Sequence, residues 1–214
     1  MVLMVLGGSA GCGGEGTGAP EAASSKGATQ QETFPDPDVR LDAEGLRKAL
    51  PELRSMPTGW RTGVVPTSAR DVPQDKRCAD GNSSDCYLMW STAVVQYKAP
   101  GDTGSVYIQL SAYPDRRTAG AALKGRNKAD APGNRAVSMP TVGNESVAFA
   151  EPRAAHATPS LTMTVRVGTA LAELIYQDEE RQPDSAKILL SLARMQAKRL
   201  LDVEQGRTPK AMAD

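Results

Sequence analysis

Few residues of this 214-residue chain have the types and spacing that catalysis needs. Nucleophilic hydrolysis requires a nucleophile beside a positioned base, and His156 is the single histidine. It lies among Ala, Thr and Pro residues typical of a loop. Asp102-Thr103-Gly104 matches the tripeptide of aspartic proteases, but it has turn composition and no second copy. The sequence therefore favours a protein that is not an enzyme and has no cofactor, with a hydrolase of unidentified active site as the alternative.

The chemistry most clearly indicated is lipid attachment at Cys12. Six apolar residues open the chain and small residues follow, as at the end of a signal peptide. Ser9-Ala10-Gly11-Cys12 resembles a bacterial lipobox, in which the cysteine thiol is diacylated, although Leu usually stands where Ser9 does. Because the apolar run is short and has no basic residues before it, we expect the signal peptide to begin upstream of Met1. An incidental cysteine in a hydrophobic N-terminus is the alternative.

Residues 13–33 are rich in Gly, Ala, Ser, Thr, Glu and Gln and show no apolar periodicity. Such a composition buries too little surface to offset the entropy of ordering, so we expect a disordered tether. Two acyl chains on Cys12 would anchor the protein stably to a membrane. The sequence therefore predicts a signal peptide end at 1–12, a tether, one folded domain at 34–201 and a flexible tail at 202–214. The predicted location is the extracytoplasmic face of the cell membrane.

The other two cysteines, Cys78 and Cys86, flank a loop-forming segment, ADGNSSD. An exported chain meets an oxidising environment, so we expect a structural disulfide that contributes about 2–3 kcal/mol. Zinc sites use closer cysteine spacings with further ligands, and a redox C-x-x-C is missing, so no metal site is predicted.

Charge and composition narrow the partners. Lys+Arg and Asp+Glu both number 25 and the pI is near 6.6, which argues against nucleic acid. No apolar run approaches the roughly 20 residues of a membrane-spanning helix. One basic concentration could attract anionic phospholipids or cell-wall polymers, or could be a solvated helix face; it comprises Arg116, Arg117, Lys124, Arg126, Lys128 and Arg135. The acidic run Asp178-Glu179-Glu180 suits the start of a helix better than a pair of glycosidase carboxylates.

Large aromatic residues are the weak candidates for a ligand pocket. Trp60, Trp90 and Tyr113 are the foremost of these, with Tyr87 beside them. Their positions after a turn and within β-prone segments are equally typical of core residues. The ligand-binding residues therefore stay unknown at this level.

The elements that must position these residues follow from periodicity. Apolar residues repeat with helical spacing after Asp42, from about 115 to 125, and most strongly from about 184 to 201. Two hairpins are predicted, at 87–112 and at 161–176, and shorter strands at 60–65, 137–141 and 145–150. This order predicts an α+β fold: an antiparallel twisted sheet of about five to seven strands with three helices packed against it.

Five features in this order resemble actinobacterial exported lipoproteins, which are distantly similar to the extracellular sensor domain of PknH-type kinases and to PsbP-like envelope lipoproteins. The features are Leu50-Pro51 with Met56-Pro57-Thr58-Gly59-Trp60, the Cys78/Cys86 pair, Val142-Gly143-Asn144-Glu145-Ser146, Val165-Arg166-Val167-Gly168, and Ala193-x2-Gln196-x2-Arg199-Leu200. The kinase sensor domains carry two disulfides, whereas this chain has one available pair.

The resemblance implies a ligand- or partner-binding, sensor-like domain of the cell envelope, anchored to the membrane by lipid. A structural envelope protein that holds a partner near the membrane is the third hypothesis. No partner or ligand can be named from the sequence.

Overall fold

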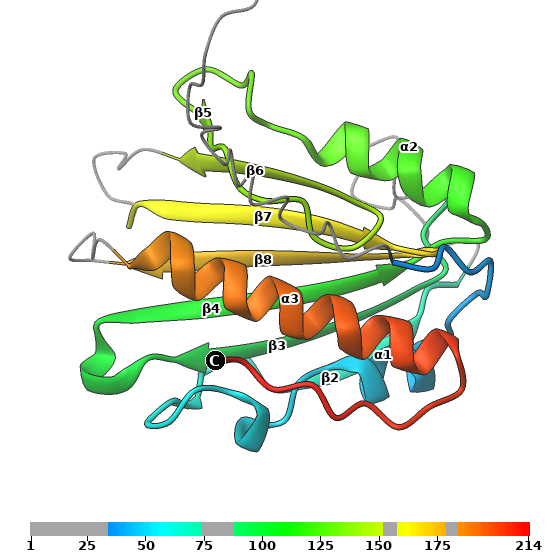
Figure 1. Ribbon diagram of the computed structural model, residues 1–214, viewed down its shortest axis with the longest axis horizontal. Helices are drawn as coiled ribbons and strands as arrows, with labels where there is room; N and C mark the ends of the chain where they lie inside the picture. The colour runs from blue at the N-terminus through cyan, green and yellow to red at the C-terminus, as the bar shows by residue number, and fades with distance from the viewer. Residues whose placement is uncertain (1–33, 74–87, 152–157, 179–183) are drawn as a thin grey trace, which may run out of the picture. The chain divides into compact units, whose positions relative to one another are not determined.

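The computed structural model describes residues 34–73, 88–151, 158–178 and 184–214. The helices in these ranges are α1 (Ala43–Ala49), α2 (Arg116–Arg126) and α3 (Ser185–Glu204). The strands are β1 (Arg61–Thr62), β2 (Ser68–Asp71), β3 (Ser91–Lys98), β4 (Gly104–Ala112), β5 (Arg135–Ala136), β6 (Glu145–Glu151), β7 (Ser160–Val167) and β8 (Ala170–Asp178). All pair antiparallel in one sheet, in the order β1-β3-β4-β8-β7-β6-β5, with β2 also paired to β3 (Figure 1). The predicted α+β class is confirmed.

Both predicted hairpins are present, because each combines alternating apolar residues with a turn-forming link. β3 and β4 pair from Ser91↔Ala112 to Lys98↔Ser105, and β7 pairs with β8 across the two-residue turn Gly168-Thr169. Gly168 has φ +51°, the left-handed conformation that the first central position of such a turn requires. The two hairpins meet at the centre of the sheet, where β4 pairs with β8 over nine residue pairs.

The short edge elements differ from the prediction. β2 lies outside every strand that the sequence predicted; its mostly exposed residues form a strand by pairing with β3 along the edge of the sheet. The strand predicted at 60–65 shrinks to the two residues of β1. The strand predicted at 137–141 is wrong: pairing with β6 ends after the bond from Val137 N to Ala148 O, and Pro140 has no backbone N–H to continue it.

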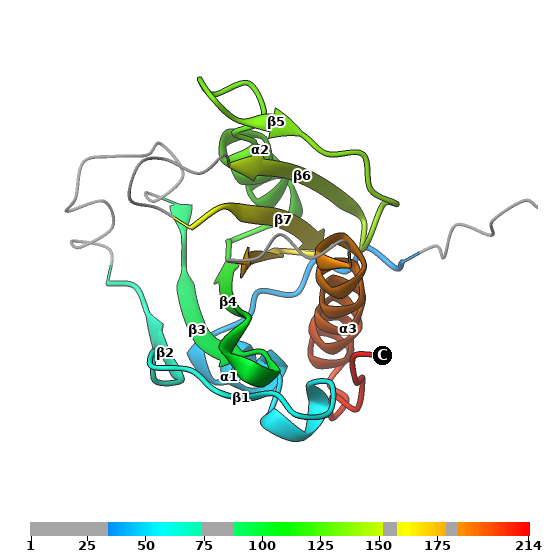
Figure 2. The ribbon, with the colours of Figure 1, turned by 90° about the vertical axis from the view of Figure 1, so that its left-hand side faces the viewer.

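α1 and α3 cover one face of the sheet (Figure 2). α1 begins at Asp42, whose carboxylate accepts a hydrogen bond from Gly45 N at 2.8 Å, as expected of an N-cap. α3 carries the apolar stripe predicted for the last helix, including the fully buried Leu189, Leu192 and Leu200. These pack against alternate residues of the strands, so the main core lies between the sheet and these two helices.

A buried arginine of α3 ties α1 and the C-terminal segment to this core. Arg199, only 4 % exposed, donates five hydrogen bonds. Three acceptors are carbonyls at the C-terminal end of α1 and just after it, where unpaired carbonyls carry partial negative charge. The others are the Ser55 hydroxyl and the Ala211 carbonyl. Where the sequence predicted a flexible tail, Glu204 still belongs to α3, and Ala213 N donates to Ser55 O at 2.9 Å.

Candidate functional site

The face of the sheet opposite α1 and α3 has a different character. Strand register sets the rows of side chains across it, and the central row runs through Val94, Gln109, Glu173, Thr164 and Val147. α2 covers this face over β6, β7 and β8 through its small apolar residues. Over β3 and β4 the outward residues are half-buried rather than buried. This face therefore combines polar groups with partial exposure, which the helix-covered face does not.

Arg126, the last residue of α2, organises a polar network on this face. Its Nη2 donates to the Ser111 hydroxyl and the Tyr113 hydroxyl, both at 3.1 Å. Its Nη1 lies 3.6 Å from a carboxylate oxygen of Glu173 on β8. The side chains of Arg126 and Glu173 are 16 % and 20 % exposed, so the pair is largely shielded from water but still reachable from the surface. A ligand could reach the Glu173 carboxylate without the sheet opening.

Neighbouring residues extend this network. Burial, and then the charge of Glu173, raise the pKa of Tyr107, so this phenol stays a neutral hydrogen-bond donor at physiological pH. Thr164 lies directly opposite Glu173 in the pairing of β7 with β8. Its hydroxyl is buried and has no hydrogen-bond partner in the ranges that the structure describes. The half-buried Tyr107 and Gln109 offer donors and acceptors beside the apolar Ile175, a mixture suited to a polar ligand with some apolar surface.

The end of the sheet near the β7–β8 turn holds the segment 34–41, here called the N-terminal strap. Arg166 of β7, 6 % exposed, pairs with Asp36 of the strap at 2.7 Å and with Glu145 of β6 at 2.9 Å. Burial works against this charge, but the two carboxylates outweigh it and raise the pKa of Arg166. Asn144 Nδ2 donates to the carbonyls of Phe34 and Pro35, both at 3.1 Å. The strap is thus held by the ion pair between Arg166 and Asp36 and by hydrogen bonds from the Asn144 side chain to strap carbonyls.

Glu204, at the end of α3, is buried beside this cluster. One carboxylate oxygen accepts from Thr169 N at 3.2 Å, and the other is buried with no hydrogen-bond partner in the described ranges. Burial raises the pKa of Glu204 to about 8; Asp36 and Asp38 add to the rise, while the Thr169 N–H and Arg166 oppose it. Glu204 is therefore mostly protonated at neutral pH.

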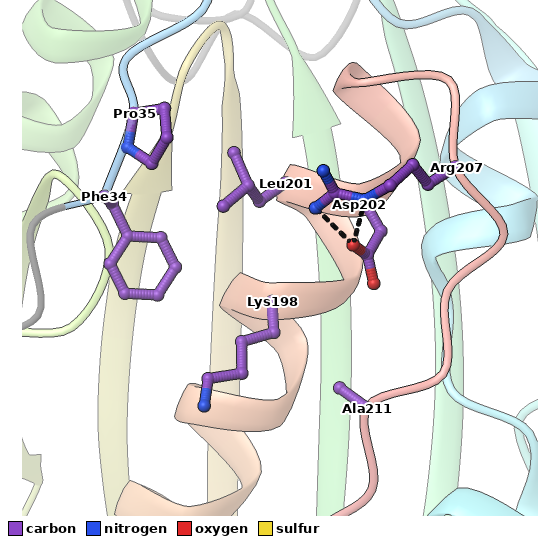
Figure 3. Close-up of a pocket in the computed structure, with 7 residues that line it drawn as sticks. All are labelled: Phe34, Pro35, Lys198, Leu201, Asp202, Arg207 and Ala211. Carbon is purple, nitrogen blue, oxygen red and sulfur yellow. Dashed lines mark hydrogen bonds and ion pairs between the residues drawn. The ribbon is translucent and has the colours of Figure 1, made fainter.

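A hollow of about 270 Å³ lies on the outer side of α3, between the strap and the C-terminal segment (Figure 3). Phe34 and Leu201 contribute apolar surface, and Asp202 is paired with Arg207 at 2.6 Å. A larger hollow of about 570 Å³ between α1 and the C-terminal segment includes Arg199 in its lining, but all five N–H groups of Arg199 already have acceptors. Neither hollow offers a buried polar group aimed at a ligand, so the polar sheet face is the stronger candidate.

The structure does not bring the candidate aromatic residues together. Trp60 is buried in the main core, with its ring centroid 6.4 Å from that of Tyr176. Trp90 is half-buried at the start of β3 beneath the guanidinium of Arg40, which lies 3.8 Å from the ring centroid. Tyr113 is fully buried under α2, but its hydroxyl joins the Arg126 network. Of the three, only Tyr113 contacts the candidate site.

Several predicted residues lie outside the described ranges: Cys12, Cys78, Cys86, Tyr87 and His156. Asp102 lies in the β3–β4 turn, where it pairs with Arg61 and Lys98. Asp178, the last residue of β8, is buried, and its carboxylate accepts a hydrogen bond from the Ser185 hydroxyl at the start of α3.

Sequence reasoning missed the three buried charged residues Arg166, Arg199 and Glu204. Two of these residues had a local signal in the sequence. Arg166 is a charged residue within the alternating pattern of β7, and Glu204 lies just after the predicted end of the last helix. Arg166 and Arg199 had been named only as parts of the family resemblance, and nothing local marked Arg199 as buried, because a polar residue is ordinary in an amphipathic helix.

No group of His, Cys, Asp or Glu side chains in the described ranges is arranged to hold a metal ion. Among the helices of those same ranges, none has the length and apolar composition to cross a bilayer.

The fold and the site together define an α+β domain with one helix-covered face and one polar, partly open face. No protein-family model and no curated protein sequence matches the chain. Among solved structures, the extracellular domain of PknH from Mycobacterium tuberculosis is similar, with a TM-score of 0.52 and 11% sequence identity. The match covers 78% of this chain and 98% of that domain. At this identity the similarity shows a shared fold, which supports the resemblance to PknH-type domains.

Proposed function

We propose that this protein is an exported, lipid-anchored lipoprotein whose folded body is a non-catalytic, sensor-like domain that binds a ligand or protein partner in the cell envelope. The observation that carries the proposal is the Arg126–Glu173 network on the polar sheet face. An antiparallel sheet commonly leaves one face to water, and here α1 and α3 cover one face whereas α2 covers the other only over β6, β7 and β8. A largely shielded ion pair that can still be reached from the surface, beside neutral donors, is typical of a surface that recognises polar groups.

The extracytoplasmic location is supported by two independent features. Ser9-Ala10-Gly11-Cys12 has the lipobox pattern, and the similar solved structure is an extracellular domain.

Site-specific photocrosslinking tests the binding face. A photoreactive residue at Gln109 or Ile175, both half-buried on the polar face, should capture a specific envelope component in intact cells. The matched control is the same residue at Val64, which is 80% exposed in the segment between β1 and β2. Glu173→Gln should abolish the adduct at Gln109 without changing thermal stability by more than a few degrees. Identical crosslinking at all three positions, or an adduct unaffected by Glu173→Gln, would refute the assignment of this face.

The anchor is tested separately by intact mass after membrane extraction. The proposal requires a diacylglycerol adduct on Cys12 and a mass lower by two hydrogens for a Cys78–Cys86 disulfide. Cys12→Ala should release the protein from the membrane fraction. Recovery of an unprocessed intracellular protein with three free thiols would contradict the proposed location.

A further inference from the structure

The structure divides the basic concentration of the sequence into two groups. Arg116 pairs with Asp36 and Asp38 of the strap, and Arg126 pairs with Glu173, so both serve the body of the protein. The remaining four are exposed, and the structure gives no ion pair within 4 Å for them in the described ranges; they are Arg117, Lys124, Lys128 and Arg135. Arg117 is nevertheless near enough to the Asp115 carboxylate to help lower its pKa, after the hydrogen bonds from Thr118. We call these four residues the basic surface.

The basic surface faces away from the sheet. Arg117 and Lys124 are seven residues apart in α2, which is almost two full turns, so they share one side of the helix. The buried residues Ala119, Ala122 and Leu123 occupy the opposite side. Lys128 lies in the connection from α2 to β5, which also carries the exposed Asp130, and Arg135 is the first residue of β5. The four exposed cations therefore follow one another from α2 to the start of β5.

Stability does not explain this arrangement. α2 contains four basic and no acidic residues within its bounds, so it lacks the oppositely charged pairs that support exposed helices. Arg117 also lies in the first turn, where the positive end of the helix dipole disfavours a cation, although the N-cap carboxylate of Asp115 offsets part of this effect. Residues 115–136 carry six basic and two acidic side chains, although the whole chain is neutral. A local surplus with a stability cost indicates an anionic partner.

The shape of the surface indicates which anionic partner. Between Arg117 and Lys124 only Ala121 is exposed, and Thr118 and Gly120 are half-buried. The Thr118 hydroxyl is hydrogen-bonded to the Asp115 carboxylate, so this side of α2 offers a shaped ligand no aromatic ring, amide or unengaged hydroxyl. The carboxylate closest to Gly120, that of Glu145, is already bonded to Arg166. Such a surface responds to charge density rather than to ligand shape, which suits the plane of an anionic bilayer.

We propose that the basic surface docks the domain onto a bilayer that contains anionic phospholipids. The interaction adds to the lipid anchor of the proposed function but does not depend on it. It would fix which side of the tethered body faces the membrane, because a flexible tether alone leaves the orientation free. The contact is electrostatic, since α2 exposes no large apolar side chain beside Arg117 and Lys124.

Vesicle cosedimentation tests the proposal with the full chain carrying Cys12→Ala, so that acylation cannot contribute. The chain should bind vesicles of phosphatidylglycerol and phosphatidylcholine in equal parts, and not vesicles of phosphatidylcholine alone. Each cation near an anionic surface strengthens partitioning onto the vesicle about fivefold. Replacing all four by Gln should therefore weaken vesicle binding by roughly two to three orders of magnitude. Raising the salt from about 0.1 M to about 0.5 M should largely abolish binding.

The matched control replaces four other exposed cations by Gln; they are Arg47, Arg70, Arg194 and Lys210. This variant has the same net charge as the first, so equal loss of binding in both would overturn the proposal. Equal binding to neutral and anionic vesicles would overturn it too, as would binding to a soluble polyanion such as heparin without binding to vesicles. Thermal unfolding of both variants confirms that the fold is intact.

Discussion

The buried carboxyl group of Glu204 should make stability depend on pH in an unusual direction. Its pKa is near 8 in the folded protein and 4.5 when exposed. Between these values the unfolded chain releases the proton while the folded protein keeps it, so the unfolded state binds fewer protons and stability falls as pH rises. The slope is about 1.4 kcal/mol per pH unit, and the total across this window is about 5 kcal/mol. Above pH 8 both states are ionised and the effect levels off.

Glu204→Gln isolates this effect, because the amide keeps an acceptor for Thr169 N and cannot ionise. The variant should match the parent near pH 4.5 and should exceed it by about 5 kcal/mol above pH 8, a large share of a typical domain's stability. Urea unfolding followed by tryptophan fluorescence at several pH values measures the difference. Trp60, buried in the main core, provides the signal.

Glu44→Gln is the control, since Glu44 is exposed on α1 and forms only a surface pair with Lys48. Its difference from the parent should stay within about 0.5 kcal/mol at every pH. The reasoning fails if the Glu204→Gln difference is constant with pH, or if the parent becomes more stable than the variant in alkali. Either result would mean that Glu204 is ionised in the folded protein.

Three further substitutions test how the fold is held together. Arg199→Met removes five hydrogen bonds to α1 and the C-terminal segment and should lower the free energy of unfolding by about 3–5 kcal/mol, whereas the exposed Arg194→Met should change it by less than about 0.5 kcal/mol in the same urea assay. Gly168→Ala should cost more than Gly206→Ala, because both have positive φ but only at Gly168 would the new Cβ overlap the Glu204 carboxylate; equal unfolding temperatures would contradict this. Arg166→Gln should increase amide hydrogen exchange in the strap by at least tenfold while exchange in α1 stays unchanged, and equal acceleration in both would show general destabilisation instead.

Local patterns made much of the fold predictable. The strands of each hairpin alternate apolar and polar residues around a turn, so neighbouring segments alone define them. The last helix was predictable for the same reason, because its apolar residues repeat at helical spacing over five turns. The edge strands were not: β2 is exposed and has a polar sequence, and only its pairing with β3 makes it a strand.

The candidate site was less predictable than the fold. Tyr113 was identified as an aromatic residue, but its role comes from the hydroxyl that meets Arg126. Arg126 was identified as one of six cations, and nothing in the spacing separated it from the four that remain exposed. Glu173 and Arg126 are 47 residues apart in the chain, and they meet because β8 pairs with β4 beneath α2.

The sequence by itself determined the α+β class, the two hairpins and the amphipathic last helix, because these depend on residues close together in the chain. It also supplied the lipobox pattern at Cys12 and the expectation of an exported protein. Only the tertiary structure decided which charges are buried and with what they pair. Arg166, Arg199 and Glu204 are ordinary polar residues until distant segments enclose them, since burial and pairing are set by contacts across the whole fold.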